Sequence, residues 1–408
     1  MKTPLFHIDQ ALTASTPVPH YVEVFVTGFG RTVREQAEQP FPVAGTLQDF
    51  SVHLGTAPGV GASWKFDIYK NGSVTAITIT ISDTNTTGTS SDTLAVLAGD
   101  LIVMLITPSA GPAPANSTLN NCIVFNAAVK KSVILGGTAG AALINSSTQY
   151  QAFSGGSSWN GTEVNRSQVA PTAGTIKNLY VNMASNPGGG TKGYKFTVYK
   201  NGLATALTAT ISGSNVTASD TSNSFSVVAG DLLSMESVPQ NSPSNAIRVH
   251  WATEFNPTVD GESMNLSGGL TPDNTSITYG SLDGATTNNL ATETLTYAHS
   301  SISCVFKTMY VSLTAAPGAG NSYTFALRKN ASTQAMSVQI ADAATTGNSS
   351  STVSMNSTNN INYICTPFSS PTTPSFSRVS FTVFVQSRVN GLFDFFESSG
   401  GNSRELCH

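Results

Sequence analysis

The sequence predicts an all-β protein made of three tandem antiparallel β-sandwich domains of jelly-roll type. One stretch occurs three times, as WKFDIYKNG at 64–72, YKFTVYKNG at 194–202 and YTFALRKN at 323–330. In each copy apolar and polar residues alternate, which is the period of a strand with one face on a core. Charged residues are only 10% of the chain, and Ser, Thr, Asn and Gly are abundant. Such a composition is typical of strands joined by many turns.

A tight hairpin is predicted where the first two copies of this strand end. Asn71-Gly72 and Asn201-Gly202 follow the alternating residues directly. Asn-Gly readily supplies the two positive φ angles of a type I′ turn. The chain then continues through 76–81 and 206–211, where apolar and polar residues alternate again. The predicted local unit is therefore strand, tight turn, strand.

The three copies also match on both sides of this hairpin. Upstream, PVAGTL at 42–47 corresponds to PTAGTI at 171–176, and downstream LAGDL at 97–101 corresponds to VAGDL at 228–232. The third copy has TNNI at 358–361 and so loses the Gly-Asp. Equivalent positions are 128 to 131 residues apart. Solenoid repeats span only about 20–50 residues, so each copy is expected to be a whole domain with its own core.

The expected domain boundaries follow from these matches. Each copy has enough candidate strands for a two-sheet sandwich, and both joints are short, so neighbouring domains are expected to touch. An immunoglobulin-like sandwich is the alternative, although such domains are usually nearer about 100 residues. The predicted segments are an N-terminal arm at 1–19, three β-sandwich repeats at 20–127, 128–256 and 257–386, and a Phe-rich tail at 387–408.

Two segments stand out from the repeat pattern. Residues 31–38 (RTVREQAE) are the densest charge cluster, predicted as one or two helical turns or an exposed loop. A solvated edge is the favoured interpretation, with docking of a partner as the alternative. The tail carries Phe393, Phe395 and Phe396 outside all three repeats. Because an isolated apolar tail has no core of its own, these residues are expected to pack on their own domain or to form an assembly contact with another chain.

Charge and hydropathy argue against several classes of protein. The formal net charge is −4 and Lys and Arg do not cluster, so a nucleic-acid groove is not expected. Residues 1–9 have no apolar core of signal-peptide length. A membrane-spanning helix needs about 18 consecutive apolar residues, and no segment approaches this length. We expect synthesis in a cytoplasm without a signal peptide and no membrane insertion.

No stretch predicts catalysis, a cofactor or a metal site. The six histidines show no metal-ligand spacing, and His53 and His250 are expected as surface or half-buried strand residues. No G-x-S-x-G motif occurs, and no pair of acidic residues recurs. The four cysteines are interpreted as free thiols, most of them packed in strands. A bridge between Cys304 and Cys365, or an intermolecular bond through Cys407, is the alternative.

Sugar binding is considered separately, because shallow glycan sites on β sandwiches use exposed aromatic and amide side chains. Tyr150 and Trp159 both lie in the second copy, and Trp159 lies in the loop GGSSWNG at 155–161. A loop tryptophan could stack on a sugar ring, or it could fold back as a lid on its own core, which is the favoured interpretation. Trp159 and Tyr150 are the candidate glycan contacts.

The strand ending in YKNG, its return strand and the following AGDL, in a chain rich in Ser, Thr and Gly, resemble the jelly-roll repeats of tailed-bacteriophage particle proteins. Fibres, spikes and decoration proteins belong to this group. The resemblance implies a non-enzymatic structural component of the virion, made in the host cytoplasm. It also implies a homo-oligomer, with a trimer favoured, attached to other virion proteins through one terminus.

A second hypothesis comes from a different class of function. It is a glycan- or receptor-binding adhesin that contacts a host-surface glycan, with the second repeat as its binding domain. An enzyme is the third hypothesis, and it would need acidic residues or histidines that converge only in the folded chain.

Overall fold

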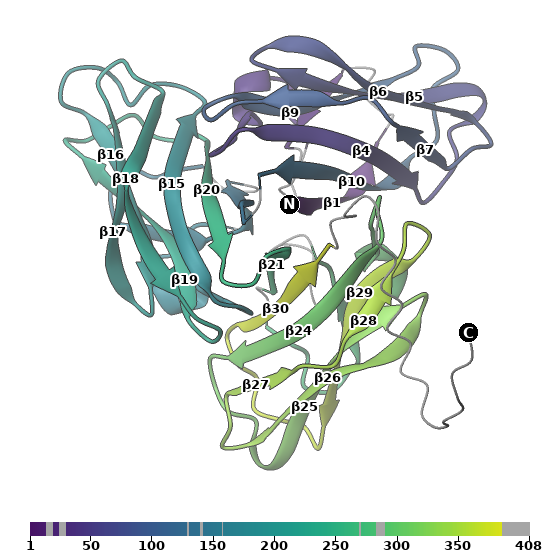
Figure 1. The fold of residues 1–408 in the computed structure, drawn as a ribbon, viewed down its shortest axis with the longest axis vertical. Coiled ribbons are helices and arrows are strands. Elements are labelled where there is room, and N and C mark those ends of the chain that lie inside the picture. Colours follow the sequence, from purple (N-terminus) through teal and green to yellow (C-terminus); the bar gives the residue numbers. More distant parts are fainter. Residues whose placement is uncertain are drawn as a thin grey trace, which may run out of the picture.

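The computed structural model describes residues 1–13, 19–23, 30–128, 130–138, 142–156, 158–268, 271–282 and 290–385. Within these residues the chain forms thirty strands and three short 3-10 helices. The strands make six sheets, which pair into three β sandwiches. Figure 1 shows the three sandwiches grouped around a common centre.

We name the sandwiches 1, 2 and 3 in chain order. Sandwich 1 consists of β1 (Lys2–Leu12), β2 (His20–Val22), η1 (Arg34–Gln36), β3 (Gln39–Pro40), β4 (Gly45–Leu54), β5 (Gly59–Lys70), β6 (Ser73–Asp83), β7 (Thr87–Ser90), β8 (Leu94–Val96), β9 (Leu101–Pro108) and β10 (Ser117–Ala127). Sandwich 2 consists of β11 (Ser132–Gly137), β12 (Gln149–Ala152), β13 (Gly155–Gly156), η2 (Glu163–Asn165), β14 (Gln168–Val169), β15 (Gly174–Met183), β16 (Gly193–Lys200), β17 (Leu203–Ser212), β18 (Thr217–Val227), β19 (Leu232–Gln240) and β20 (Val249–Pro257). Sandwich 3 consists of β21 (Glu262–Gly268), β22 (Thr278–Gly280), η3 (Glu293–Thr296), β23 (Ala298–His299), β24 (Cys304–Leu313), β25 (Gly318–Lys329), β26 (Ser332–Asp342), β27 (Thr346–Ser349), β28 (Val353–Met355), β29 (Asn360–Phe368) and β30 (Ser377–Phe384).

The strand order is the same in all three sandwiches, except that sandwich 2 has an extra short strand, β13, beside β11 and a single strand, β18, where sandwich 1 has β7 and β8. In sandwich 1 the first sheet runs β1-β10-β4-β7, with β8 also on β4, and the second runs β2-β9-β5-β6, with β3 also on β9. This is the order of a jelly roll and differs from that of an immunoglobulin sandwich. The named strands pair antiparallel, apart from the short parallel pair of β11 and β13. The predicted fold class is confirmed.

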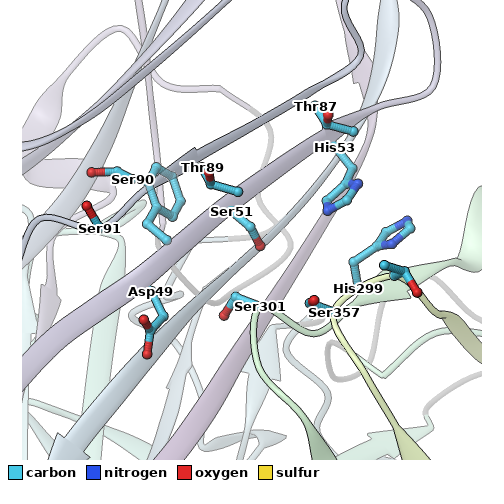
Figure 2. A pocket seen from close by; sticks show the side chains of 12 residues that line it. Asp49, Ser51, His53, Thr87, Thr89, Ser90, Ser91, His299, Ser301 and Ser357 are labelled. Carbon is cyan, nitrogen blue, oxygen red and sulfur yellow. The ribbon is translucent and has the colours of Figure 1, made fainter.

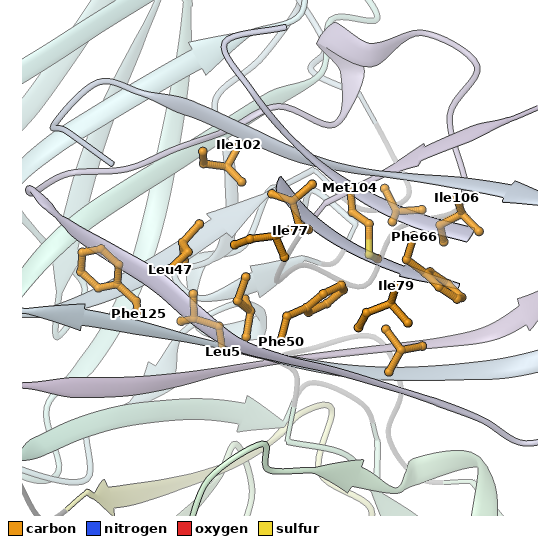
Figure 3. Close-up of a cluster of buried hydrophobic side chains, with 14 of the residues drawn as sticks. Leu5, Leu47, Phe50, Phe66, Ile77, Ile79, Ile102, Met104, Ile106 and Phe125 are labelled. Carbon is orange, nitrogen blue, oxygen red and sulfur yellow. The ribbon is translucent and has the colours of Figure 1, made fainter. Parts of the chain in front are cut away.

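The core of sandwich 1 lies between its two sheets, as Figure 3 shows. The strand that defines the repeat contributes Phe66 and Ile68, both fully buried, and the return strand contributes Ile77 and Ile79. The intervening polar residues face outward, so the alternation in the sequence marks the two faces of the sheet.

The predicted hairpins have the expected backbone conformation. In the first hairpin φ is 49° at Asn71 and 81° at Gly72, and in the second it is 53° at Asn201 and 77° at Gly202. These positive values confirm the prediction of I′-type turns. The third copy keeps the same conformation without a glycine, with φ of 50° at Asn330 and 60° at Ala331.

The Lys-Asn-Gly and Ala-Gly-Asp motifs recur together because they bind each other. Asn71 Nδ2 donates a 2.7 Å hydrogen bond to Asp100 Oδ1, and the Leu101 N–H donates to Asn71 Oδ1 at 2.8 Å. Although burial raises the pKa of Asp100, hydrogen bonds from Lys70, the Leu97 N–H and Asn71 hold it below its ordinary value. Asn201 and Asp231 repeat the 2.7 Å contact in sandwich 2.

The N-terminal segment corrects one prediction. Residues 1–19 were expected to form an arm, but Lys2–Leu12 is β1 and pairs with β10. Leu5 packs in the core of sandwich 1, whereas Phe6, on the opposite face, packs into the core of sandwich 3. A strand that is buried on both faces shows no clear alternation of apolar and polar residues, so this strand was not predicted from the sequence.

The three sandwiches form a closed ring through an exchange of apolar side chains. Phe6 of sandwich 1 lies in the core cluster of sandwich 3, Leu135 of sandwich 2 in that of sandwich 1, and Leu266 of sandwich 3 in that of sandwich 2. These residues occupy corresponding positions in the first strands β1, β11 and β21. Each sandwich thus completes the core of a neighbour, and the cycle returns to its start.

The charge cluster at 31–38 contributes to this ring. Its middle forms the 3-10 helix η1, and Arg34 Nε lies 2.8 Å from Glu38 Oε1. The Glu38 carbonyl accepts a 3.2 Å hydrogen bond from Asn182 of sandwich 2. Glu38 is only 5% exposed. One end of the cluster therefore docks on a neighbouring sandwich within the same chain.

Candidate functional site

An open pocket of about 570 Å³ lies between sandwiches 1 and 3 (Figure 2). Sandwich 1 contributes β4, β7 and the residues after β7. Sandwich 3 contributes β23 and the loops before β24 and β29. The pocket wall carries many hydroxyl groups, among them those of Ser51, Thr89, Ser90, Ser91, Ser301 and Thr358.

Two imidazoles at one end of the pocket face each other across the interface. The rings of His53 and His299 are stacked, with their centroids 3.9 Å apart and their planes 5° from parallel. Burial, together with the neighbouring charge of His53, lowers the pKa of His299 to about 3. Burial also lowers the pKa of His53. Both rings are therefore neutral at neutral pH.

Asp49 brings a carboxylate to the other end of the pocket (Figure 2). It lies in an irregular part of β4, with φ of 51°. Its Oδ2 accepts hydrogen bonds from Gln48 Nε2 at 2.8 Å and from Lys2 Nζ at 3.2 Å. The carboxylate charge is thus partly balanced by Lys2, and the pocket carries little net charge.

His250 lies in a different environment from the one that the sequence predicted. It was expected to be at the surface or half-buried, but it is fully buried. Its Nε2 lies 3.1 Å from Glu23 Oε1, so the pair joins sandwich 2 to sandwich 1. The expectation for His250 was wrong because the outer face of β20 is covered by the neighbouring sandwich.

Tyr150, one of the two candidate glycan contacts, belongs to a half-buried cluster on sandwich 2. Its hydroxyl donates to Glu236 Oε1 at 3.4 Å, and Tyr199 donates to the same oxygen at 2.7 Å. The two rings are in edge contact with centroids 5.4 Å apart. Burial and the Glu236 charge raise the pKa of Tyr150. The cluster ties β12 to β16 and β19.

Trp159, the other candidate glycan contact, is only 7% exposed. It lies in the core cluster of sandwich 2, and its ring centroid is 6.1 Å from that of Trp251. A ring buried to this extent has no open face for a sugar. The structure therefore favours the interpretation of Trp159 as a lid on its own core.

The remaining candidates from the sequence are the cysteines and the phenylalanines of the tail. Cys122, Cys304 and Cys365 are buried and free, which confirms the interpretation of these three as packed thiols. Burial raises the pKa of Cys122 to about 11 and that of Cys304 to about 12. The candidate assembly contacts Phe393, Phe395 and Phe396 lie outside the described residues, as does Cys407.

The described residues lack two further kinds of feature. They contain no group of three or more His, Cys, Asp or Glu side chains that could hold a metal ion. In the same part of the chain no helix is long and apolar enough to cross a membrane.

Comparisons with known proteins add no family to this description. No protein-family model matches the chain, and a search of the curated proteins found no match. The pocket between sandwiches 1 and 3 was not predicted from the sequence, because its walls come from repeats 1 and 3. One signal was nevertheless present, since an alignment of the repeats places Ser51 against Tyr180 and Tyr310.

Proposed function

We propose that this protein is a non-enzymatic structural component of a tailed-bacteriophage particle, of fibre, spike or decoration type. The observation that supports the proposal is the closed ring of three jelly rolls, in which each sandwich buries an apolar side chain in the core of the next. The strand and turn motifs that resemble phage particle proteins are the ones that build each sandwich.

A ring closed within one chain suits a virion component that must stay assembled at low protein concentration. A trimer made of separate chains dissociates as its concentration falls. Linking the three sandwiches in one chain makes their association intramolecular, which raises the effective concentration of each partner to about the millimolar range or above. A homotrimer was favoured from the sequence. In this proposal a single chain already supplies a threefold set of sandwiches, and other virion proteins are its partners.

The proposal is tested by locating the protein in particles. Antibodies raised against the purified full-length protein are used for immunogold electron microscopy of virions from a lysate of the producing host. Gold at a fixed position on the particle is the expected result. Unlabelled virions, with all of the protein in the soluble fraction of the lysate, would overturn the proposal.

Solution mass provides an independent measurement. If the intramolecular ring replaces a trimer of chains, light scattering of the full-length protein gives the mass of one chain, 42.4 kDa, at all concentrations tested. A stable mass of three chains would show that the ring is itself a building block of a larger oligomer. It would return the homotrimer to the proposal.

The alternative function, an adhesin with sandwich 2 as its binding domain, has lost part of its support. Trp159 is buried, so Trp159→Ala would open the core and would not test binding by itself. Tyr150 remains, but its hydroxyl already bonds to Glu236. A binding function has better support elsewhere in the ring.

A further inference from the structure

We propose that the pocket between sandwiches 1 and 3 binds a neutral, polyhydroxylated ligand, namely a saccharide. The proposal concerns a site that only the ring creates. It does not depend on whether the protein is part of a virion. This interface differs from the other two at one corresponding position.

At the other two interfaces a tyrosine packs on a glycine turn. Tyr180 of sandwich 2 lies against Gly99 of sandwich 1, where a Cβ added to the glycine would be 3.7 Å from Tyr180 Cε1. Tyr310 of sandwich 3 lies against Gly230 of sandwich 2, and the same construction gives 3.3 Å to Tyr310 Oη. Each aromatic ring thus fills the space between neighbouring sandwiches.

Ser51 stands at the corresponding position of sandwich 1. Tyr180 lies opposite Ala252, Tyr310 lies opposite Ser380, and Ser51 lies opposite Cys122, each time on the last strand of its own sandwich. The turn that faces Ser51 in sandwich 3 has Thr358 at the position of the two glycines. The third interface therefore lacks the aromatic side chain, and both residues line the pocket.

Two polar atoms of the pocket wall have no hydrogen-bond partner among the residues that the structure describes. Ser51 is 4% exposed, and its Oγ is buried and unpaired. The Nδ1 atom of His299 is also buried and unpaired. Figure 2 shows the Ser51 and His299 side chains at the pocket. Buried polar groups in proteins are almost always paired. These two unpaired atoms are therefore suited to accept a hydrogen bond from a ligand or to donate one to it.

The chemistry of the wall selects the class of ligand. Eight of the twelve residues that line the pocket are serine or threonine, so its polar groups are mainly hydroxyls, set among apolar surface of the kind that small-molecule pockets usually present. Hydroxyl groups both donate and accept hydrogen bonds, as sugar hydroxyls do. The two imidazoles are neutral, and Asp49 is paired with Lys2, so a strongly charged ligand gains little here. A neutral saccharide fits these properties.

The proposal is tested with the full-length protein and a defined set of sugars. Saturation-transfer-difference NMR is recorded with a mixture of the methyl glycosides of glucose, galactose, mannose and N-acetylglucosamine. We expect saturation transfer to at least one of them. The Ser51→Tyr variant places in the pocket the residue that the other two interfaces already carry, and it should reduce the affinity for that sugar at least tenfold.

The matched control is Tyr180→Ser, which makes the reverse change at the interface of sandwiches 1 and 2. It leaves the proposed pocket intact, and its saturation transfer should equal that of the wild type. If Ser51→Tyr fails to fold, Asp49→Asn keeps the shape of the pocket and weakens an acceptor, and it should lower the affinity severalfold. No transfer to any of the four glycosides, or transfer that survives in folded Ser51→Tyr, would overturn the proposal.

Discussion

The interface between sandwiches 2 and 3 and that between sandwiches 1 and 3 use corresponding strand positions in opposite ways. Arg378 on β30 is fully buried, and its Nε donates to the Ser167 carbonyl at 2.7 Å across the first of these interfaces. Its Nη2 donates to Ser167 Oγ at 2.9 Å. Asn120 occupies the corresponding position on β10, and its Oδ1 is buried without a hydrogen-bond partner in the described part of the chain.

This comparison shows that a ring of similar domains need not be uniform. A short linker joins sandwiches 1 and 2, and another joins sandwiches 2 and 3. Sandwiches 1 and 3 meet only by folding, at the interface that closes the ring. The closing interface has a stacked histidine pair and a pocket rich in hydroxyl groups, where the others have a half-buried tyrosine packed on a glycine turn. We therefore expect it to be the weakest of the three and the most responsive to pH and to ligands.

The largest difference should appear when the two corresponding residues are removed. Arg378→Met leaves the Ser167 carbonyl and hydroxyl buried without their charged donor, and it should lower the free energy of unfolding by about 3 kcal/mol. Asn120→Ala is the matched control and should change it by less than about 1 kcal/mol, because Asn120 already has an unpaired atom. Urea denaturation of both variants measures the difference. Equal losses would contradict the comparison.

The second prediction concerns the pH dependence of the closing interface. The pKa of His299 is about 3 in the folded protein, and its ordinary value is 6.5. Between these values the unfolded chain binds a proton that the folded chain does not, so stability falls as the pH falls. The stabilising contribution of the neutral His299 is fully present above about pH 6.5, and about 2 kcal/mol of the free energy of unfolding should be lost between pH 7 and pH 5.

Urea midpoints of wild type and His299→Gln at pH 7 and pH 5 measure this effect. Glutamine does not titrate, so the variant should lose less stability than the wild type over this interval. His53 also has a lowered pKa, and part of the slope should therefore remain. A wild-type slope in His299→Gln would show that the histidine stack is not its source.

The smallest predicted effect lies away from the ring and separates the stability of a sandwich from that of its interfaces. Ala331 has a positive φ of 60° in a turn where the other two sandwiches have glycine. A left-handed conformation strains an alanine, so Ala331→Gly should raise the free energy of unfolding by about 1 kcal/mol. Thermal unfolding of this variant measures the gain.

Gly202→Ala is the matched control for this turn. A Cβ there would meet no atom within 4 Å, so only the backbone conformation is changed. The free energy of unfolding of Gly202→Ala should therefore be about 1 kcal/mol lower than that of the wild type. A gain in both variants, or in neither, would show that the third turn is not strained.

Much of the fold could be predicted because each sandwich is specified by short-range pattern. Alternation at Phe66 and Ile68 marks a strand face, and Asn-Gly supplies the positive φ angles of a hairpin. The recurrence of these signals three times predicted three domains. Three of the cysteines could be interpreted as free because the second repeat, which has none, needs no bridge.

The features that could not be predicted from the sequence lie on surfaces that meet only in the ring. Phe6 and His250 lie on strand faces that would be exposed in an isolated sandwich but are covered by a neighbour. The two interpretations of Trp159 differed only in whether the loop folds back, which is decided by the space beside Trp251.

The sequence by itself determined three antiparallel β sandwiches, because alternation and turn chemistry act between residues that are close along the chain. The tertiary structure decided their jelly-roll strand order, since that order depends on pairing between strands that are far apart in the sequence. The tertiary structure alone decided how the sandwiches close on one another, since that depends on which outer faces meet. Ser51 illustrates the division. Its difference from Tyr180 and Tyr310 can be read from an alignment of the repeats, but only the closed ring turns that difference into a pocket.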